Sequence, residues 1–165
     1  MELNPTIRKA RIGDAETIAD FNIAMALETE GKSLEKEKIS AGVKNLFRHP
    51  EYGFYIVAEV DGQVAGCLMV TYEWSDWRNG LFWWIQSVYI HPDCRRKGIY
   101  RTMYSFVKKL ALKEKNICGF RLYVEKENIN AQRTYTALGM TECQYKMFEE
   151  ITEQNHIYQK KQKLI

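Results

Sequence analysis

A short basic turn is the part of this 165-residue sequence with the clearest chemistry. Arg95, Arg96, Lys97 and Arg101 lie within seven residues, and Gly98 stands among them. The turn follows an apolar run typical of a buried strand and precedes residues at helical spacing. Successive backbone N–H groups and the helix dipole would therefore point at one spot, which favours a phosphate group. The cations strengthen that preference. A solvated basic turn that caps a helix is the simpler alternative.

A second group of residues suits a cationic amine, because ring faces and carboxylates both attract an ammonium group. Its carboxylates are Glu73 and Asp76, and its aromatic members are Trp74, Trp77, Trp83 and Trp84. A polyamine, an amino acid or a lysine side chain would fit among these rings and carboxylates. The alternatives are solvated charges for the acidic residues and core or dimer packing for Trp83 and Trp84.

Composition narrows the class of protein. The chain is 45% hydrophobic and 27% charged, and it has no apolar run of the roughly 18 residues that span a membrane. The N-terminus has no signal-peptide pattern, so we expect a cytoplasmic protein without a membrane partner. The histidines and cysteines show no metal-ligand spacing, which predicts no metal site. The net charge of +3 is mild, and its basic excess is local, in the basic turn and in Lys160, Lys161 and Lys163 of the tail. Together with the lack of a phosphate-loop motif, this argues against a nucleic-acid partner.

The length predicts one domain over residues 1–165, with a core at 6–148 and a tail at 149–165. We expect a first helix capped by Asp14 and ended by Gly31, and a second over 33–47 capped by Ser33. Asp61-Gly62 predicts a tight hairpin. The remaining elements are strands 6–11, 54–60, 63–72, 81–90, 120–124 and 141–148, a loop at 73–80, and helices from 98 and over 130–138. This order indicates an α/β fold with a mixed sheet and helices on both faces.

Two motifs resemble those of the GNAT superfamily of acyl-CoA-dependent N-acyltransferases. Arg95-x-x-Gly98 resembles the family's pyrophosphate loop, although Tyr100 stands where the family has Gly or Ala. The segment Asn128-x-x-Ala131-x-x-x-Tyr135-x-x-x-Gly139-Met140 matches a second family motif, apart from Met140 in place of Phe. The resemblance implies a mostly antiparallel twisted sheet with a splayed central strand pair that holds acetyl-CoA, and it extends over most of the chain.

The resemblance also implies roles for residues. The cofactor would lie against Val88, Tyr89, Ile90, Asn128, Tyr135 and the turn formed by Arg95, Arg96, Lys97, Gly98, Ile99, Tyr100 and Arg101. Tyr135 aligns with the tyrosine that protonates the departing thiolate, and its alternative role is packing against Ala131 and Leu138. We expect Asn130 to cap the last helix, which would leave Asn128 for the ligand, although capping by Asn128 is the alternative.

The motifs do not identify the residues that would bind the acceptor amine or remove its proton. Gln86 stands where some family members have a glutamate base, and an amide cannot act as a base. Water relayed to Glu28, Glu30, Glu73 or Asp76 is therefore the hypothesis for proton removal, with solvated charges as the alternative. The expected activity is transfer of an acetyl group from acetyl-CoA to a primary amine by direct attack. A catalytically inactive acyl-CoA sensor is the alternative function, and the family also makes a homodimer an expectation.

Overall fold

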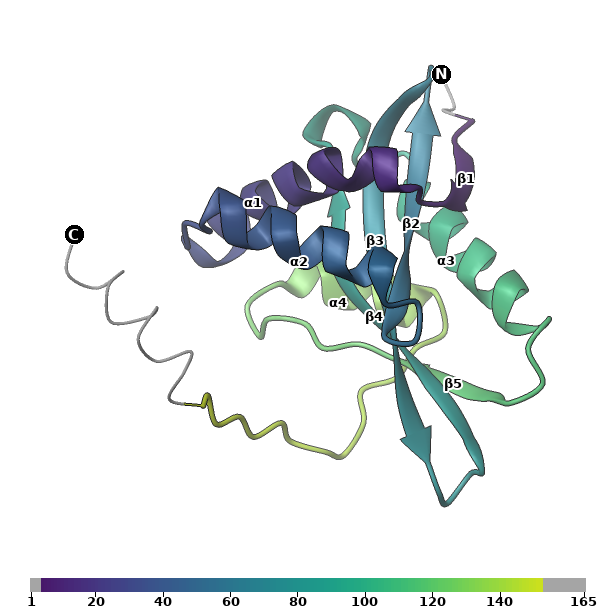
Figure 1. Ribbon diagram of the computed structural model, residues 1–165. Coiled ribbons are helices and arrows are strands. Elements are labelled where there is room, and N and C mark those ends of the chain that lie inside the picture. The colour runs from purple at the N-terminus through teal and green to yellow at the C-terminus, as the bar shows by residue number, and fades with distance from the viewer. Residues whose placement is uncertain (1–3, 153–165) are drawn as a thin grey trace. The chain divides into compact units, whose positions relative to one another are not determined.

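The computed structural model describes residues 4–152, which divide into two compact units, 4–126 and 127–152 (Figure 1). The second unit contains α4, Ile129–Ala137. The expected single domain over 1–165 stays a prediction, and most of the expected tail lies outside the described residues. The elements of the first unit are, in order, β1 Thr6–Lys9, α1 Ala15–Glu30, α2 Lys36–Arg48, β2 Gly53–Val60, β3 Gln63–Ser75, β4 Gly80–Ile90, α3 Ile99–Ala111 and β5 Ile117–Arg121.

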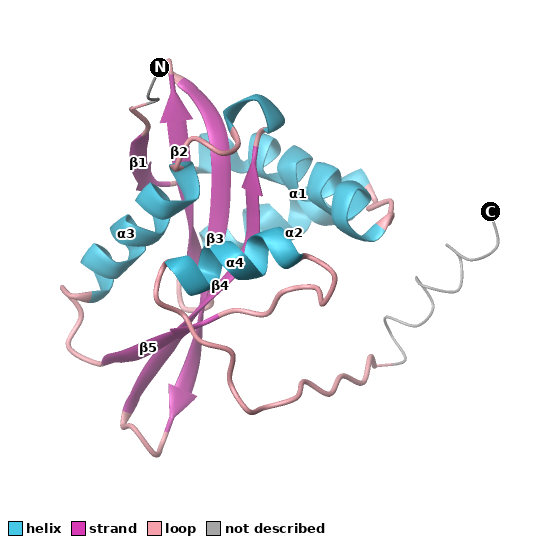
Figure 2. Ribbon diagram, turned by 180° about the vertical axis from the view of Figure 1, so that it is seen from behind, coloured by secondary structure: helices cyan, strands magenta, loops and turns pink. Residues whose placement is uncertain are grey.

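The first unit is built on a twisted five-stranded sheet whose strands lie in the order β1-β2-β3-β4-β5. The first three pairings are antiparallel, and β4 pairs with β5 in parallel. Figure 2 shows these strands in magenta, with α3 on the face opposite α1 and α2. The predicted α/β class, with a mixed and mostly antiparallel sheet, is confirmed.

Both faces of this sheet bury apolar side chains. On one face, Ile18 and Phe21 of α1 and Val43 of α2 pack against Tyr55 and Val57 of β2. The alternate strand positions Ile56, Leu68 and Val70 point to the other face, and each is fully buried. A sheet covered on both sides gives a rigid frame, so residues at the strand ends are held in fixed positions.

The hairpin predicted from Asp61-Gly62 is confirmed. Asp61 has a φ of 51° and Gly62 a φ of 75°, and both values are left-handed. Two successive left-handed residues match the twist of antiparallel strands, which is why Asp-Gly is favoured there. The turn joins β2 to β3 and fixes their register from Val60 opposite Gln63.

Three local predictions were wrong. Residues 141–148 form no strand, and Tyr145 and Phe148 are exposed there, because alternation yields a strand only where a partner strand supplies hydrogen bonds. The expected loop at 73–80 is a loop only at 76–79, since β3 continues to Ser75 and β4 begins at Gly80. The strand expected at 120–124 lies at Ile117–Arg121, where the parallel register with β4 places it.

The start of α2 was also predicted wrongly. Glu35 occupies the N-cap position, two residues after Ser33. Lys36, the first residue of the helix, forms ion pairs with Asp20 and Glu16 of α1. The observed start of α2 therefore coincides with ion pairs between the two helices. Such contacts cannot be predicted from a local sequence pattern.

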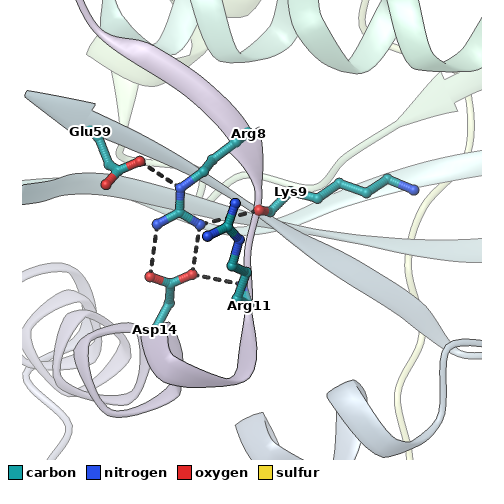
Figure 3. A network of polar contacts seen from close by, with 5 residues as sticks. All are labelled: Arg8, Lys9, Arg11, Asp14 and Glu59. Carbon is teal, nitrogen blue, oxygen red and sulfur yellow. Dashed lines mark hydrogen bonds and ion pairs between the residues drawn. The ribbon is translucent and has the colours of Figure 1, made fainter. Parts of the chain in front are cut away.

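A partly buried guanidinium, that of Arg8, links β1 to its neighbours (Figure 3). Arg8 donates from Nε to Glu59 Oε2 at 2.5 Å and from both terminal nitrogens to Asp14, at 2.8 and 3.0 Å. Asp14 also accepts from the backbone N–H of Arg11 at 2.7 Å. The hydrogen bonds from Arg8 are the main reason why the pKa of Asp14 is lowered, and burial opposes them. The carboxylate of Asp14, the expected N-cap of α1, therefore bonds to Arg8.

We expect Arg8→Met to lower the free energy of unfolding by about 2 kcal/mol at pH 7, because two partly buried carboxylates would lose their partner. The pKa of Asp14 in the folded protein lies below its ordinary 3.8, so its contribution is present above that pH and is lost as the pH falls through the lowered value. Urea unfolding at pH 7 and pH 3 measures this. An equal loss at both values would contradict the assignment, and Arg48→Met on the surface of α2 is the control.

Candidate functional site

Strands β4 and β5 separate at the middle of β4. The last paired residues are Trp84 of β4 and Arg121 of β5, whereas β4 continues to Ile90. Within residues 4–152, no strand pairs with β4 on that side between 85 and 90. Backbone N–H and C=O groups of a strand need partners. This stretch, which contains the predicted cofactor residues Val88, Tyr89 and Ile90, can therefore bind an extended ligand through its main chain.

A bulge interrupts β4 in the same stretch. Cys67 pairs with Tyr89 and Met69 with Gln86, so two residues of β4, Ser87 and Val88, lie opposite Leu68 alone. Ser87 has a left-handed φ of 51°. A bulge bends its strand and re-aims the backbone groups beside it. Backbone groups of β4 at the bulge therefore do not follow the regular ladder of hydrogen bonds. Among them, the N–H of Val88 is the candidate donor to the oxyanion.

The basic turn has the backbone conformation of an anion site. Arg96 and Gly98 are both left-handed, with φ values of 61° and 77°, and α3 begins directly afterwards at Ile99. Gly98 is the N-cap and supplies no side chain to the first N–H groups of the helix. Left-handed residues among ordinary ones turn successive N–H groups toward one point, and the helix dipole adds to their effect. The turn can therefore bind phosphate through its main chain.

The four cations of this turn fall into two pairs. Arg95 donates to the Ile90 carbonyl at 2.8 Å and Lys97 to the Asp93 carbonyl at 2.8 Å, so both stabilise the turn itself. Arg96 and Arg101 are exposed, and in the part of the chain that the structure describes neither has a hydrogen bond or ion pair. Arg96 and Arg101 are therefore the cations available to a ligand.

Glu28 joins the end of α1 to this turn. Its carboxylate pairs with Arg95 at 2.7 Å and accepts from the Tyr89 hydroxyl at 3.1 Å. Arg95 also lies over the Tyr89 ring, at 5.3 Å from its centroid. Burial, followed by the bond to Glu28, raises the pKa of Tyr89. Glu28 was predicted on the acceptor side, and the structure places it against the predicted cofactor turn.

Polar side chains from three strands meet on the sheet face that carries the α1 and α2 core. Gln86 donates to Thr71 at 2.6 Å. Glu73 pairs with Arg121 at 2.6 Å and accepts from the indole N–H of Trp84. Cross-strand pairs and alternate positions share a face, and Trp84 lies opposite both Thr71 and Arg121. The predicted acceptor residues Glu73 and Gln86 therefore share this face: Gln86 lies next to the bulge, and Glu73 lies opposite Phe82, which is four residues before Gln86 along β4.

The other predicted acceptor residues are not brought to this face. Trp74 alternates with Glu73 along β3, points to the opposite face and is 56% exposed. Asp76 lies in the hairpin turn, where it accepts from the N–H of Trp77 at 2.8 Å. Glu30 pairs with Lys32 at 2.5 Å. Three residues that the sequence did not single out do belong to this face: Thr71, Phe82 and Arg121.

Tyr100 occupies the position at which the resemblance leads one to expect Gly or Ala. Its ring stacks on that of Tyr104, with centroids 6.2 Å apart and parallel planes. Both rings belong to the first turns of α3. The bulky residue is therefore packed along its own helix, and the neighbouring Ile99 is buried.

The second unit contains the other motif. Asn128 is the N-cap of α4 and accepts from the backbone N–H of Ala131 at 3.2 Å, so the expectation that Asn130 caps this helix was wrong. The cap bond requires a side chain directly before the first helical residue, which is Ile129. Gly139 follows the helix with a φ of 92°, as a residue just beyond a helix end should. Burial raises the pKa of Tyr135 above its ordinary value of 10.

Across residues 4–152, no group of three or more His, Cys, Asp or Glu side chains could hold a metal ion. In the same residues, no helix is long and apolar enough to cross a membrane.

Comparison with known proteins gives the family. The sequence model of the acetyltransferase (GNAT) family matches residues 18–140. A crystal structure of a possible acetyltransferase from Clostridium difficile 630 is 50% identical, with a TM-score of 0.83, and the match covers 92% of this chain and 99% of that one. No curated protein matches the chain.

More distant structures share the fold. A transcriptional regulator from Bacillus halodurans C-125 is 22% identical over 90% of this chain and 100% of that one, with a TM-score of 0.76. A structure from Clostridium acetobutylicum, described as a predicted acetyltransferase with acetyl-CoA, is 18% identical over 89% and 96%, with a TM-score of 0.73. Since the family match spans well over half of the sequence, the chain belongs to the GNAT family and is an N-acetyltransferase.

Proposed function

We propose that the protein binds acetyl-CoA along the free side of β4 and transfers its acetyl group directly to a primary amine bound at the same time. The observation that carries this proposal is the separation of β4 from β5 next to a left-handed basic turn. The first feature offers backbone partners to an extended chain and the second offers N–H groups to a diphosphate. Acetyl-CoA has both parts in that order, and its thioester supplies the activated acyl group.

The residues of β4 and the turn have separate tasks in this proposal. Backbone groups of Val88 to Ile90 hold the extended arm, which positions the thioester at the bulge. The N–H of Val88 donates to the carbonyl oxygen as negative charge develops there. Arg96 and Arg101 meet the phosphates, while Arg95 and Lys97 hold the turn in shape.

Proton transfers complete the reaction. As the amine nitrogen forms its bond to the acyl carbon, the carbon–sulfur bond breaks and Tyr135 donates its phenolic proton to the departing sulfur. The amine nitrogen loses a proton to water. Glu73 is the carboxylate that lies on the same face as Gln86 and Thr71, so we assign the end of this water relay to Glu73.

The alternative is a catalytically inactive acyl-CoA sensor, and two measurements separate it from the enzyme. Acetyl-CoA at 100 times its Kd should stabilise the purified protein by about 2.7 kcal/mol in a thermal-shift titration. Thiol release from acetyl-CoA should then depend on an added amine, tested with amino acids, polyamines, aminoglycosides and lysine peptides. Stabilisation without release from any amine would support the sensor, and no stabilisation would refute acetyl-CoA binding.

We expect Arg96→Gly to stabilise the protein and to weaken acetyl-CoA binding. A left-handed residue other than glycine costs roughly 1 kcal/mol, so glycine should raise the free energy of unfolding by about that amount. Loss of the exposed cation should raise the Kd for acetyl-CoA by about 3-fold to 10-fold. Urea unfolding and calorimetric titration measure the two effects. Arg48→Gly is not a suitable control, because Arg48 lies in a helix. The control is instead Arg101→Gln, which should weaken acetyl-CoA binding and leave the free energy of unfolding unchanged.

A further inference from the structure

A cavity of about 360 Å³ lies on the sheet face that carries α3, and its lining residues all belong to the first unit. We propose that this cavity is a second ligand site, which binds a small carboxylic acid that carries an aromatic ring. Binding there would be separate from the proposed acetyl transfer and does not require it. The volume is in the range of cavities that enclose small organic molecules.

The cavity lies apart from the predicted acetyl-CoA site. Leu81 and Trp83 of β4 line it. Leu81 is six residues before Ser87 of the bulge, which is roughly 20 Å at about 3.3 Å per residue. Trp83 alternates with Trp84 along β4, so its side chain points to the face opposite that of Gln86. A ligand in the cavity would therefore lie on the other side of the sheet from the predicted acceptor residues.

Three aromatic rings form the wall of the cavity. The rings of Phe54 and Trp83 meet edge to face, with centroids 5.3 Å apart, and the Tyr72 centroid lies 6.3 Å from the first and 6.2 Å from the second. Leu110 and Ile117 add aliphatic surface. Trp83 is only 4% exposed, so its ring is held in place by packing. Such a wall favours a flat apolar ring.

Two polar groups of this wall have no partner in the protein. Within residues 4–152, neither the Tyr72 hydroxyl nor the Trp83 indole N–H makes a hydrogen bond. Burial, followed by the charge of Glu114, raises the pKa of Tyr72, so its hydroxyl keeps its proton at neutral pH. Both groups are therefore donors that an oxygen atom of a ligand can satisfy.

The exposed edge of the cavity carries uncompensated charge. Lys9 and Lys113 line it, and so does one carboxylate, Glu114, among the residues that the structure describes. None of the three forms an ion pair in residues 4–152, and the Lys9 ammonium lies 4.6 Å from the centroid of the Phe54 ring. Two cations against one carboxylate leave a net positive edge. A ligand carboxylate would gain charge-assisted bonds there, whereas an amine would have Glu114 alone.

The test compares ligands that share a ring and differ in the end group. Calorimetric titration of 3-phenylpropionate into the full-length protein should give a Kd of about 1 mM or lower, as expected for a ligand of this size. The Kd should be about fivefold or more higher for 3-phenylpropanol, which has no charge, and higher still for 3-phenylpropylamine. Propionate, which has no ring, should give no measurable binding.

Variants assign the binding to the cavity. Lys113→Gln should raise the Kd for 3-phenylpropionate by about threefold to tenfold, and Lys109→Gln, the same change at an exposed position of α3 that does not line the cavity, should leave it unchanged. Glu114→Gln should act in the opposite direction and lower this Kd, because it removes a like charge. Tyr72→Phe should raise it for the carboxylate and the alcohol. Thermal unfolding shows that each variant is folded.

Four results would overturn the proposal. They are a Kd for 3-phenylpropionate above about 10 mM, a Kd for the amine or the alcohol equal to or below that for the carboxylate, an equal effect of Lys113→Gln and Lys109→Gln, and loss of binding when acetyl-CoA is saturating. The last would mean that the carboxylate occupies the cofactor site. Since the titrations measure binding directly, they bear on the cavity whether or not the protein acetylates an amine.

Discussion

Replacement of Tyr135 by phenylalanine is expected to lower kcat for acetyl transfer by about 100-fold or more, with little change in the Kd for acetyl-CoA. The substitution removes the phenolic proton and keeps the ring, so it separates proton donation from packing. Burial raises the pKa of Tyr135 above 10, which keeps the phenol protonated at neutral and moderately alkaline pH. Activity that depends on this proton should therefore persist through pH 10, the ordinary pKa of tyrosine, and fall only at a higher pH.

Steady-state kinetics at saturating acetyl-CoA measure the effect, and calorimetric titration measures binding. Tyr52→Phe removes a hydroxyl from an exposed tyrosine that stacks on His49 and is the matched control. A kcat for Tyr135→Phe within about threefold of the wild type would contradict a role as proton donor. Packing against Ala131 and Leu138 would then be the remaining role of the tyrosine.

Gly53→Ala should lower the free energy of unfolding by about 3 kcal/mol or more. Gly53 begins β2 opposite Thr71, with a φ of 153°. A Cβ there would overlap the carbonyl oxygen of Val70 and lie 3.0 Å from its carbonyl carbon. Both atoms belong to the backbone of β3, so no side-chain rotation relieves the clash and the two strands must separate.

Gly42→Ala is the matched control for the same chemical change. Gly42 lies inside α2, and nothing would lie within 4 Å of an added Cβ. Alanine should therefore stabilise the protein by about 0.5 to 1 kcal/mol through helix propensity. Urea unfolding followed by circular dichroism measures both variants. A loss below about 1 kcal/mol for Gly53→Ala would show that β2 and β3 adjust to the added atom.

Features that depend on neighbouring residues in the sequence were predictable. The Asp61-Gly62 hairpin requires only two residues that tolerate left-handed backbone, and it forms as expected. The basic turn before α3 was recognised from Gly98 and the cations around it. Even here the local pattern had limits, because Ser33 and Asn130 were each placed as helix caps and Glu35 and Asn128 occupy those positions.

The charge partners in the site were not predictable. Glu28, Glu73 and Asp76 were equivalent carboxylates in the sequence, and the structure gives them different partners. Glu28 lies against Arg95, Glu73 against Arg121, and Asp76 against the backbone of its own turn. Arg121 drew no attention because it reaches Glu73 only through the parallel register of β5 with β4. An ion pair between residues 48 positions apart leaves no local pattern.

The sequence by itself determined the family of this protein, the order of most helices and strands, and the turn that can hold a phosphate, because glycine conformation, periodicity and clustered charge act over a few residues. Only the tertiary structure decided where β4 leaves β5, where its bulge falls, and which carboxylate meets which guanidinium. Those features follow from strand register and from packing on both faces of the sheet, which join residues far apart in the chain.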